Sequence, residues 1–428
     1  MGLAKNCIGS PDTEPLITVW LPPSLQVQFV KRPAEIKTES RVFSAQDARM
    51  LAKRRVPRLV YDFIEGGTGR EVSARENEAA FDRIKLQARV LSTSSGRNLA
   101  TDFLGQSFSG PIGVAPMGMC NLAWPGADAM IGRAAQHFGM PVCLSTAASS
   151  TIEEMRGWAG ENAWFQLYVN GTTDAALQMA GRAGDAGYDT LILTVDVPEV
   201  SRRIRDIRNG FGMPFRIGFR QALDFALHPR WTLETRISGV PTPKNFAMAN
   251  GSPAFDRHAS RAGADWEFLS VLRKQWNGNL IVKGVTAPED AIRIRDLGAD
   301  AIWVSNHGGR QLDASLPAIQ LLPKIRAALG DTCPVIFDSG VRQGEDVVRA
   351  LALGADLVML GRPILYAIAG DGEAGLNAYL RSILKEIDIA MAQIGVSTLN
   401  AIGPGNLAGK EPDETAIGPA SLKLASSK

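Results

Sequence analysis

A single histidine in a glycine-rich stretch is the first candidate for chemistry in this chain. His307 lies in WVSNHGGRQLD (303–313), after a short apolar run and before two glycines, with Arg310 and Asp313 close behind. An imidazole exchanges a proton near neutral pH, and histidine is the residue that most often acts as a general base. The chain has four histidines, and we interpret His307 as a catalytic residue rather than a structural one.

The ends of eight short apolar runs carry polar, charged or otherwise distinctive residues. These are Met117, Gly118, Ser145, Gln166, Tyr168, Thr194, Asp196, Lys283, Ser305, His307, Arg310, Asp338, Ser339, Gly340, Arg342, Gly361 and Arg362. A charged side chain at the end of an apolar run costs free energy unless a ligand or a partner satisfies it. The pattern therefore predicts one binding site built from many strand ends.

Two consecutive runs end in glycine and arginine. DSGVRQG places Gly340 and Arg342, and GRP places Gly361 and Arg362. Glycines let backbone N–H groups approach phosphate oxygens, and a guanidinium binds those oxygens through paired hydrogen bonds. These motifs predict a bound phosphate, which could belong to a substrate or to a cofactor.

The remaining donors favour a cofactor. Ser145, Gln166, Thr194 and Lys283 would line the same site, and such donors suit the edge of a flavin ring, which becomes anionic on reduction. No GxGxxG motif follows an early apolar run, which disfavours a nicotinamide dinucleotide. A flavin mononucleotide fits better, and no cysteine or histidine spacing predicts a metal site.

These residues would meet only if the eight runs form one parallel sheet. The runs are 111–117, 141–146, 163–169, 190–196, 280–285, 301–307, 334–340 and 357–362, and amphipathic helical segments separate nearly all of them. Continuous apolar strands joined by such helices indicate a parallel sheet covered by helices. Eight units predict an α/β fold, a closed (β/α)8 TIM barrel with its site at the carboxyl ends of the strands. An open doubly wound sheet is the alternative.

The flanking segments complete the predicted organisation. Residues 1–40 form an N-terminal extension, residues 41–400 the barrel domain, and residues 401–428 a C-terminal tail. Within the domain, Ser44 and Asp47 predict a capped helix that continues to the glycines at 66 and 67.

Composition narrows the class of protein. A net charge of +2 gives no reason to expect a nucleic-acid partner. Four scattered cysteines indicate buried thiols in a reducing compartment, and no apolar run reaches the roughly 18 residues of a membrane-spanning helix. We expect a cytoplasmic protein.

A long insertion, residues 201–264, interrupts the alternation after the fourth run. It holds 11 Lys and Arg against 4 acidic residues. Phe215, Phe219, Leu223 and Leu227 recur every four residues, which gives a helix one apolar stripe. A basic helix with an apolar face suits a membrane surface. The alternative is an ordinary covering helix, with its arginines in solvent or in a subunit interface.

Several motifs together resemble a known family. SNHGGRQLD, FQLYV, LTVDVP, VKGV, DSGVRQGEDVVRALALGAD and GRP are similar, in order and spacing, to the FMN-dependent 2-hydroxy-acid dehydrogenases and oxidases. The resemblance covers about residues 40–400. LAWPGAD and ALHPRW look most similar to the mandelate dehydrogenase branch, which also carries a long membrane-associated insertion after the fourth strand.

The resemblance implies a reaction and a role for each site residue. An (S)-2-hydroxy acid would be oxidised to the 2-oxo acid, with hydride passing to flavin N5 and His307 as base. Asp196 would pair with His307, Arg203 and Arg310 would hold the substrate carboxylate, and Tyr168 would hydrogen-bond the substrate. The implied FMN-binding positions are Ala115, Pro116, Met117, Ser145, Gln166, Thr194, Lys283, Ser305, Asp338, Ser339, Gly340, Arg342, Gly361 and Arg362. A homo-tetramer is also implied.

Two positions depart from the family pattern. Phe63 stands where the family usually has a substrate-binding tyrosine, and Ala147 stands where glycolate oxidase has a tryptophan. A larger pocket with one donor fewer predicts a substrate with an aromatic or branched side chain, which is larger than that of lactate.

The electron acceptor and two alternative functions stay open at this point. The electron acceptor is a quinone or respiratory carrier if the insertion contacts the inner face of the cell membrane, and O2 is plausible if it does not. A flavin-barrel isomerase acting on a diphosphate is one alternative function. A non-catalytic barrel that binds flavin or a phosphate metabolite is the other.

Overall fold

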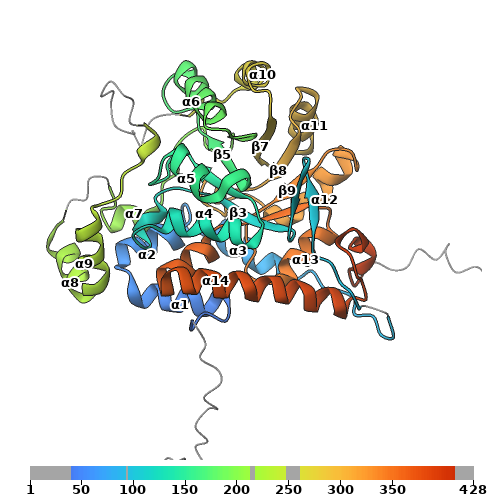
Figure 1. Cartoon of the computed structure of the whole chain (residues 1–428), viewed down its shortest axis with the longest axis horizontal. Helices are drawn as coiled ribbons and strands as arrows, with labels where there is room; N and C mark the ends of the chain where they lie inside the picture. Colours follow the sequence, from blue (N-terminus) through green and yellow to red (C-terminus); the bar gives the residue numbers. More distant parts are fainter. Residues whose placement is uncertain (1–39, 93–94, 213–216, 247–260, 410–428) are drawn as a thin grey trace, which may run out of the picture. The chain divides into compact units, whose positions relative to one another are not determined.

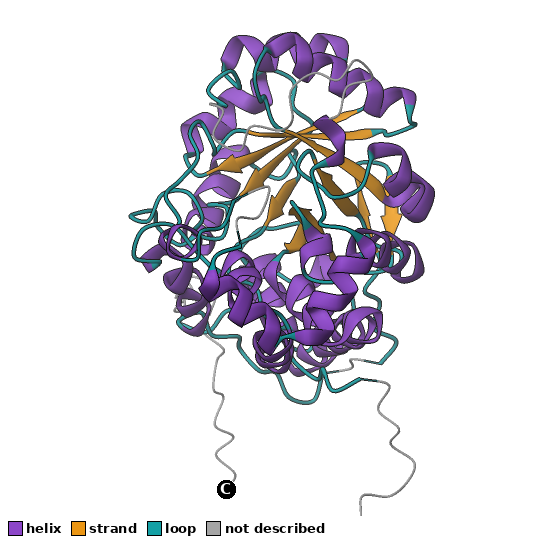
Figure 2. Cartoon of the chain, turned by 90° about the vertical axis from the view of Figure 1, so that its left-hand side faces the viewer, coloured by secondary structure: helices purple, strands orange, loops and turns teal. Residues whose placement is uncertain are grey.

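The computed structural model describes residues 40–92, 95–212, 217–246 and 261–409. Eight parallel strands close into a barrel in the order β10-β3-β4-β5-β6-β7-β8-β9 (Figure 2). The strands are β3 (Ile112–Met117), β4 (Val142–Ser145), β5 (Ala163–Leu167), β6 (Thr190–Thr194), β7 (Asn279–Val285), β8 (Ala301–Val304), β9 (Val335–Phe337) and β10 (Leu357–Leu360). The predicted (β/α)8 barrel is confirmed. Most strands end before their apolar runs do, because the polar residues at the end of those runs leave the sheet, whereas β7 spans its whole run.

Helices surround this barrel (Figures 1 and 2). Those that follow barrel strands directly are α4 (Ala127–Phe138), α5 (Ile152–Ala159), α6 (Thr173–Asp185), α11 (Pro288–Asp296), α12 (Ala318–Leu329), α13 (Gly344–Ala352) and α14 (Arg362–Gln393). Three precede the barrel, namely α1 (Ala45–Arg55), α2 (Arg58–Glu65) and α3 (Val72–Asp82). The insertion adds α7 (Ile204–Arg208), α8 (Phe219–Leu227) and α9 (Pro229–Ser238), and α10 (Trp266–Gln275) follows it before β7.

The predicted helix that begins at Ser44 is two helices. Ser44 caps α1 as expected, since its Oγ accepts a hydrogen bond from the Asp47 N–H at 3.1 Å. The first helix ends before Val56, whose backbone is extended, because proline disfavours helical backbone in the residue before it. Pro57 then precedes the first residue of α2. The break allows α2 to run in its own direction toward the barrel mouth, where its last carbonyl groups serve the site described below.

The barrel interior is closed at the end opposite the strand tips by a hairpin that the sequence did not predict. Strands β1 (Thr101–Phe103) and β2 (Gln106–Phe108) pair antiparallel, and both turn residues between them have positive φ. Phe103 and Phe108 each lie 6.0 Å from the Trp164 ring, between ring centroids. These side chains belong to the interior cluster with residues of the barrel strands. Among the described residues, this packing closes that end of the barrel to a ligand.

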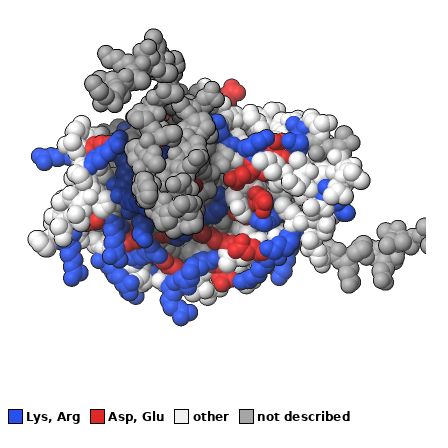
Figure 3. Space-filling view, turned by 90° about the horizontal axis from the view of Figure 1, so that it is seen from below, with Lys and Arg blue, Asp and Glu red and all other residues white. Residues whose placement is uncertain are grey.

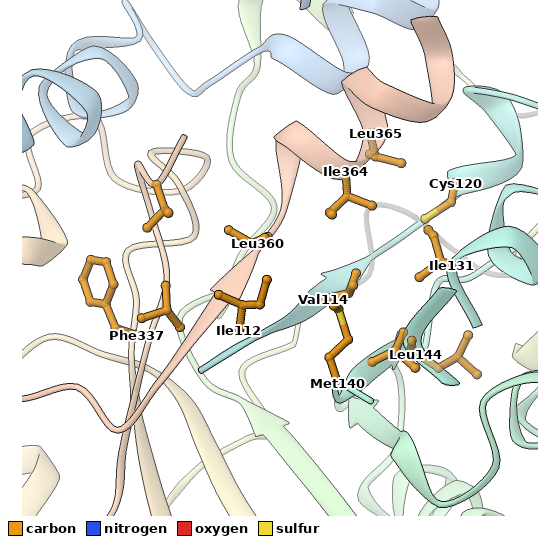
Figure 4. Packing of buried hydrophobic residues seen from close by; sticks show 14 of the residues in the cluster. Ile112, Val114, Cys120, Ile131, Met140, Leu144, Phe337, Leu360, Ile364 and Leu365 are labelled. Atoms are coloured by element: carbon orange, nitrogen blue, oxygen red, sulfur yellow. The ribbon is translucent and has the colours of Figure 1, made fainter. Parts of the chain in front are cut away.

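A second, larger core lies between the strands and the helices. Figure 4 shows Ile112 and Val114 of β3 packed beside Leu144 of β4 and Leu360 of β10. Alternate residues of one strand point into the barrel and out to the helices. Both faces are apolar, which explains the continuous runs in the sequence.

Helices α8 and α9 of the insertion lie together at the left of Figure 1, and α9 contacts the segment after β3 through Trp231. The Trp231 indole N–H donates to the Leu122 carbonyl at 2.8 Å, and its ring contacts Phe225, which is buried. The predicted apolar stripe points the other way. Phe219, Leu223 and Leu227 are exposed, whereas Phe215 lies outside the described residues. The stripe therefore does not cover the barrel.

Basic side chains gather on parts of the face of the molecule that is seen from below. Figure 3 shows Lys and Arg gathered on the left and lower parts of this face, with Asp and Glu nearer its middle. Helices α8 and α9 lie on the left in Figure 1. In the part of the chain that the structure describes, no helix is long and apolar enough to cross a membrane.

Candidate active site

The loop after β8 holds His307 in an unusual backbone conformation. His307, Gly308 and Gly309 all have positive φ, at 59°, 63° and 74°. For histidine this left-handed region is strained, and such strain concentrates at functional sites. A Cβ at position 309 would lie 2.3 Å from the Ala74 backbone N of α3. The second glycine thus lets the loop pack on α3.

Asp196 orients the His307 ring. Nδ1 of His307 lies 3.0 Å from Oδ1 and 3.1 Å from Oδ2 of Asp196. Burial opposes the Asp196 charge, yet His307 and Lys283 together hold the pKa of this carboxyl below its ordinary value. An ionised carboxylate only accepts hydrogen bonds, so Nδ1 must carry the hydrogen and Nε2 keeps its lone pair.

The free nitrogen of this histidine faces the barrel mouth. Burial lowers the pKa of His307 below its usual value, although Asp196 opposes part of that shift. The ring is therefore neutral at neutral pH and available as a base. Tyr168, just beyond the end of β5, has its hydroxyl 3.5 Å from Nε2 of His307. Burial also raises the pKa of Tyr168, so its hydroxyl remains a donor.

Lys283 supplies a buried positive charge beside this pair. Its Nζ donates to Ser305 Oγ at 2.9 Å and lies 3.3 Å from Asp338 Oδ2. Burial opposes the charge, but Asp338 and Asp196 raise the pKa of Lys283 above its ordinary value. The lysine stays charged in a place where water is excluded, which makes its field strong.

A cavity of about 610 Å³ opens at the strand tips, a volume typical of small-molecule sites. The predicted site residues that line it are Ala115, Pro116, Met117, Ser145, Tyr168, Arg203, Lys283, His307, Arg310, Asp338, Ser339, Gly340, Arg342, Gly361 and Arg362. Four others adjoin residues of this lining: Gln166 accepts a hydrogen bond from Ser145, Thr194 pairs with Lys283, Asp196 contacts His307 and Ser305 accepts from Lys283. The barrel register explains part of this arrangement, because Ser145 pairs with Gln166 and Thr194 with Lys283.

Two buried donors beside residues of the cavity lining support the flavin interpretation. Among the described residues, Nε2 of Gln166 and Oγ1 of Thr194 are buried without a hydrogen-bond partner. Buried polar groups of native proteins nearly always have partners. Both positions are among those predicted to hold the ring of FMN, whose nitrogens and oxygens would satisfy them. With the Lys283 charge alongside, the residues present fit this cofactor.

At the predicted phosphate end, the arginines differ in their contacts. Arg362 donates to the Gly308 carbonyl at 2.8 Å and to the Gly66 carbonyl at 3.1 Å. Arg342 donates to Glu78 of α3 at 2.6 Å. Burial lowers the pKa of Arg362, and the neighbouring Arg342 lowers it further. A phosphate dianion would relieve this repulsion between like charges.

The reason for glycine differs between positions 340 and 361 of the phosphate end. Gly340 has φ of 100°, and a Cβ there would lie 2.2 Å from the Asn77 carbonyl oxygen. Packing against α3 therefore requires glycine at 340, whatever ligand binds. At Gly361 nothing lies within 4 Å of an added Cβ. Protein packing therefore does not require glycine at 361, whereas close approach of a ligand would.

Two arginines and a phenylalanine form the outer wall of the cavity. Arg203 and Arg310 each lie 5.6 Å from the Phe63 ring centroid. Arg310 also donates to the carbonyls of Phe63 at 3.1 Å and Ile64 at 3.2 Å, at the carboxyl end of α2. Phe63 stacks on Phe211 of the insertion, with centroids 4.5 Å apart and planes 8° apart. The wall is aromatic where the family pattern has a hydroxyl.

The contributors to the site that the sequence analysis missed include one glycine of a strand and two residues of the insertion. Gly284 follows Lys283 with φ of 103°, and a Cβ there would lie 2.5 Å from that of Asp196. The glycine in VKGV was a readable signal for such close approach. Phe211 and Arg261 of the insertion also line the cavity, and no local pattern could have placed them there.

Comparison with known proteins defines the class. A family model for FMN-dependent dehydrogenase matches residues 52–409. The match covers most of the chain, and the chain belongs to this family. FMN is accordingly its cofactor, and the resemblance drawn from the sequence motifs is confirmed.

Individual relatives narrow the comparison. The chain is 37% identical over 380 residues to (S)-mandelate dehydrogenase of Pseudomonas putida, covering 88% of this chain and 96% of the relative. It is 37% identical over 383 residues to an L-lactate dehydrogenase of Caulobacter vibrioides, covering 87% and 99%. A crystal structure of (S)-mandelate dehydrogenase, described as a monotopic membrane protein, superposes with a TM-score of 0.83 at 37% identity, covering 87% and 100%.

Proposed function

We propose that this protein oxidises an (S)-2-hydroxy acid with a side chain larger than that of lactate. The observation that carries the proposal is the His307–Asp196 pair, whose Nδ1–Oδ1 distance is 3.0 Å, at a cavity fitted for FMN. Its geometry leaves Nε2 of the imidazole open toward the cavity. An isomerase acting on a diphosphate has no need of a base between Arg203 and Arg310.

Each residue then has a role in removing two electrons and two protons from the substrate. Bound FMN supplies the acceptor for the electrons that leave the substrate Cα. His307 takes the hydroxyl proton at Nε2, and Asp196 stabilises the imidazolium that forms. Arg203 and Arg310 hold the substrate carboxylate, and Tyr168 donates to the reacting oxygen.

The FMN site divides into a ring end and a phosphate end. At the ring end, Ser145, Gln166, Thr194 and Lys283 would provide hydrogen bonds and a positive charge, supported by the chain segment Ala115–Met117. Ser305 and Asp338 hold the lysine. At the phosphate end the donors would be Ser339, Gly340, Arg342, Gly361 and Arg362.

The outer wall supports the choice of substrate. Phe63 and Phe211 present stacked rings, and Ala147 lines the cavity with only a methyl group. An aromatic substrate side chain gains burial there, whereas lactate offers one methyl group. Mandelate-like acids should therefore exceed lactate in kcat/KM.

Anaerobic mixing of the FMN-loaded protein with each 2-hydroxy acid tests the proposal. Loss of flavin absorbance with (S)-mandelate, faster than with lactate, is the expected result. The (R)-enantiomer is the control. If no 2-hydroxy acid of a panel bleaches the flavin, the proposed reaction is wrong.

We further propose that the insertion holds the protein on the inner face of the cell membrane and that a quinone or respiratory carrier accepts the electrons. Exposed Phe219, Leu223 and Leu227 support this, as does the monotopic relative. Turnover with a quinone analogue in liposomes, compared with O2 consumption, separates the two kinds of electron acceptor.

A homo-tetramer and the organisation into residues 1–40, 41–400 and 401–428 are part of the same proposal. Light scattering and limited proteolysis test them.

A further inference from the structure

Arg261, near the end of the insertion, reaches into the catalytic cavity. Its backbone N–H donates to the Pro198 carbonyl at 2.9 Å, in the loop that carries Asp196. Two residues later, a Cβ at Gly263 would lie 2.9 Å from Cγ1 of Val169. The segment is therefore held tightly against the ends of β5 and β6, and the Arg261 side chain lines the cavity.

The guanidinium of Arg261 lies over the face of the Tyr168 ring, with Cζ 4.3 Å from the centroid. A cation over a phenol attracts the ring electrons and holds the ring in one orientation. Burial is the largest influence on the pKa of Tyr168 and raises it, and Arg261 is the largest influence that lowers it. A phenol whose electrons are drawn in this way is a stronger hydrogen-bond donor.

The same phenol faces the proposed base on its other side. Its hydroxyl is 3.5 Å from Nε2 of His307, so the substrate oxygen that loses its proton must lie close to both groups. Any tilt of the Tyr168 ring would move its hydroxyl away from that oxygen. An arginine clamped over the ring restricts this motion.

We propose that Arg261 is a positioning residue, which fixes the Tyr168 ring and strengthens its hydroxyl as a donor to the reacting oxygen of the substrate. The proposal rests on the role proposed above for Tyr168. It also gives the insertion a second task, because the segment that presents exposed helices at one end completes the catalytic wall at the other.

A double-mutant cycle tests this coupling, with the FMN-loaded full chain assayed on (S)-mandelate. Arg261→Gln should lower kcat about fivefold to tenfold and leave KM within about twofold, since Tyr168 acts on the reacting oxygen rather than on the carboxylate. Tyr168→Phe should lower kcat further. In Tyr168→Phe, adding Arg261→Gln should cost no more than about twofold.

Conservative and distant variants complete the design. Arg261→Lys retains a cation over the ring and should recover more than half of the lost rate. Arg236→Gln removes a charge from the exposed side of α9 and should leave kcat unchanged. Melting temperatures monitor folding. If Arg261→Gln melts more than about 5 °C below the native enzyme, Arg261→Met replaces it.

The outcomes separate this inference from the proposed function. If Tyr168→Phe leaves kcat unchanged, the role of Tyr168 itself is wrong. If Tyr168→Phe is slow but Arg261→Gln is as fast as the native enzyme, the inference about Arg261 is wrong. Full additivity of the two losses, or a lysine variant as slow as the glutamine variant, would also overturn it.

Discussion

The barrel mouth and the insertion handle charge and apolar surface in opposite ways. At the mouth, Lys283 is 3% exposed and is held by Asp338 and Ser305, so that a full positive charge remains in a nearly dry place. On the insertion, Phe219 is 86% exposed and Leu227 71% exposed. Each arrangement is costly alone, since isolated buried charges and exposed apolar patches both raise the free energy.

The difference shows where a ligand or a partner is expected. A buried charge with oriented neighbours stabilises charge that develops in a reaction, so the mouth is suited to chemistry. An exposed apolar stripe among arginines stabilises association with a surface, so α8 is suited to docking. Substitutions in the two regions should consequently affect different measurements.

The largest effect should follow removal of the base. His307→Ala should lower kcat about a thousandfold, because it removes the imidazole that takes the hydroxyl proton in the proposed reaction. Flavin absorbance of the purified variant shows whether FMN remains bound. If steady-state kcat falls less than tenfold while FMN is retained, the mouth does not use this base.

Asp196→Asn should lower kcat about a hundredfold and change the pH profile. The neutral imidazole is the active form, and the pKa of His307 lies below its ordinary value of about 6.5, so kcat/KM of the native enzyme should fall only as the pH drops below that value. Asp196 raises this pKa, so its removal should move the acid limb to still lower pH. A shift to higher pH would contradict the assigned pairing.

Gly284→Ala should lower kcat about tenfold and reduce the free energy of unfolding by ~2 kcal/mol. The new Cβ meets Asp196, and φ of 103° is strained for alanine. Gly181→Ala on α6 is the matched control, since nothing lies within 4 Å of its Cβ. Equal behaviour of the two variants in urea unfolding and in kcat would show that the spacing at Asp196 is unimportant.

Leu227→Ser should reduce partition onto anionic liposomes about tenfold and leave kcat in detergent-free assay unchanged, because an exposed leucine contributes by burial in the bilayer boundary. Ile389→Ser, an exposed apolar residue on α14, is the control. Sedimentation with vesicles measures the partition. Unchanged partition for Leu227→Ser, or equal loss in both variants, would remove the stripe from any role at a membrane.

The smallest effect should come from Phe63→Tyr. A restored hydroxyl near Arg203 and Arg310 would add one hydrogen bond to the substrate carboxylate, worth ~1 kcal/mol, or about fivefold in kcat/KM. The gain should be similar for lactate and mandelate, because both share the carboxylate. A loss with mandelate alone would mean that the Phe63–Phe211 stack matters more than the donor.

Features that depend on residues close together in the sequence could be predicted, and contacts between residues far apart in the sequence could not. The positions of the eight strands and of His307 at a strand end followed from local periodicity, which reports burial directly. The helix break at Pro57 was also readable, although the prediction ran through it. By contrast, nothing near Phe103 or Phe108 in the sequence showed that they would close the barrel around Trp164.

The insertion shows the same limit. Its apolar stripe and basic charge were visible in the sequence, but either face of α8 could have covered the barrel. Burial of Phe225 against Trp231 decided which face turns outward.

By itself the sequence determined the eight-strand alternation and the polar residues at the strand tips, because spacing of two or 3.6 residues sets which side chains share a face. The cofactor class followed from the donor types at those tips and from motifs that resemble a known family. Only the tertiary structure decided which tips meet. The Nδ1 contact of His307 with Asp196, the anchoring of Arg310 on α2 and the placement of Arg261 over Tyr168 join residues from separate segments. Their geometry depends on barrel closure and on the paths of the connecting segments, which local periodicity does not encode.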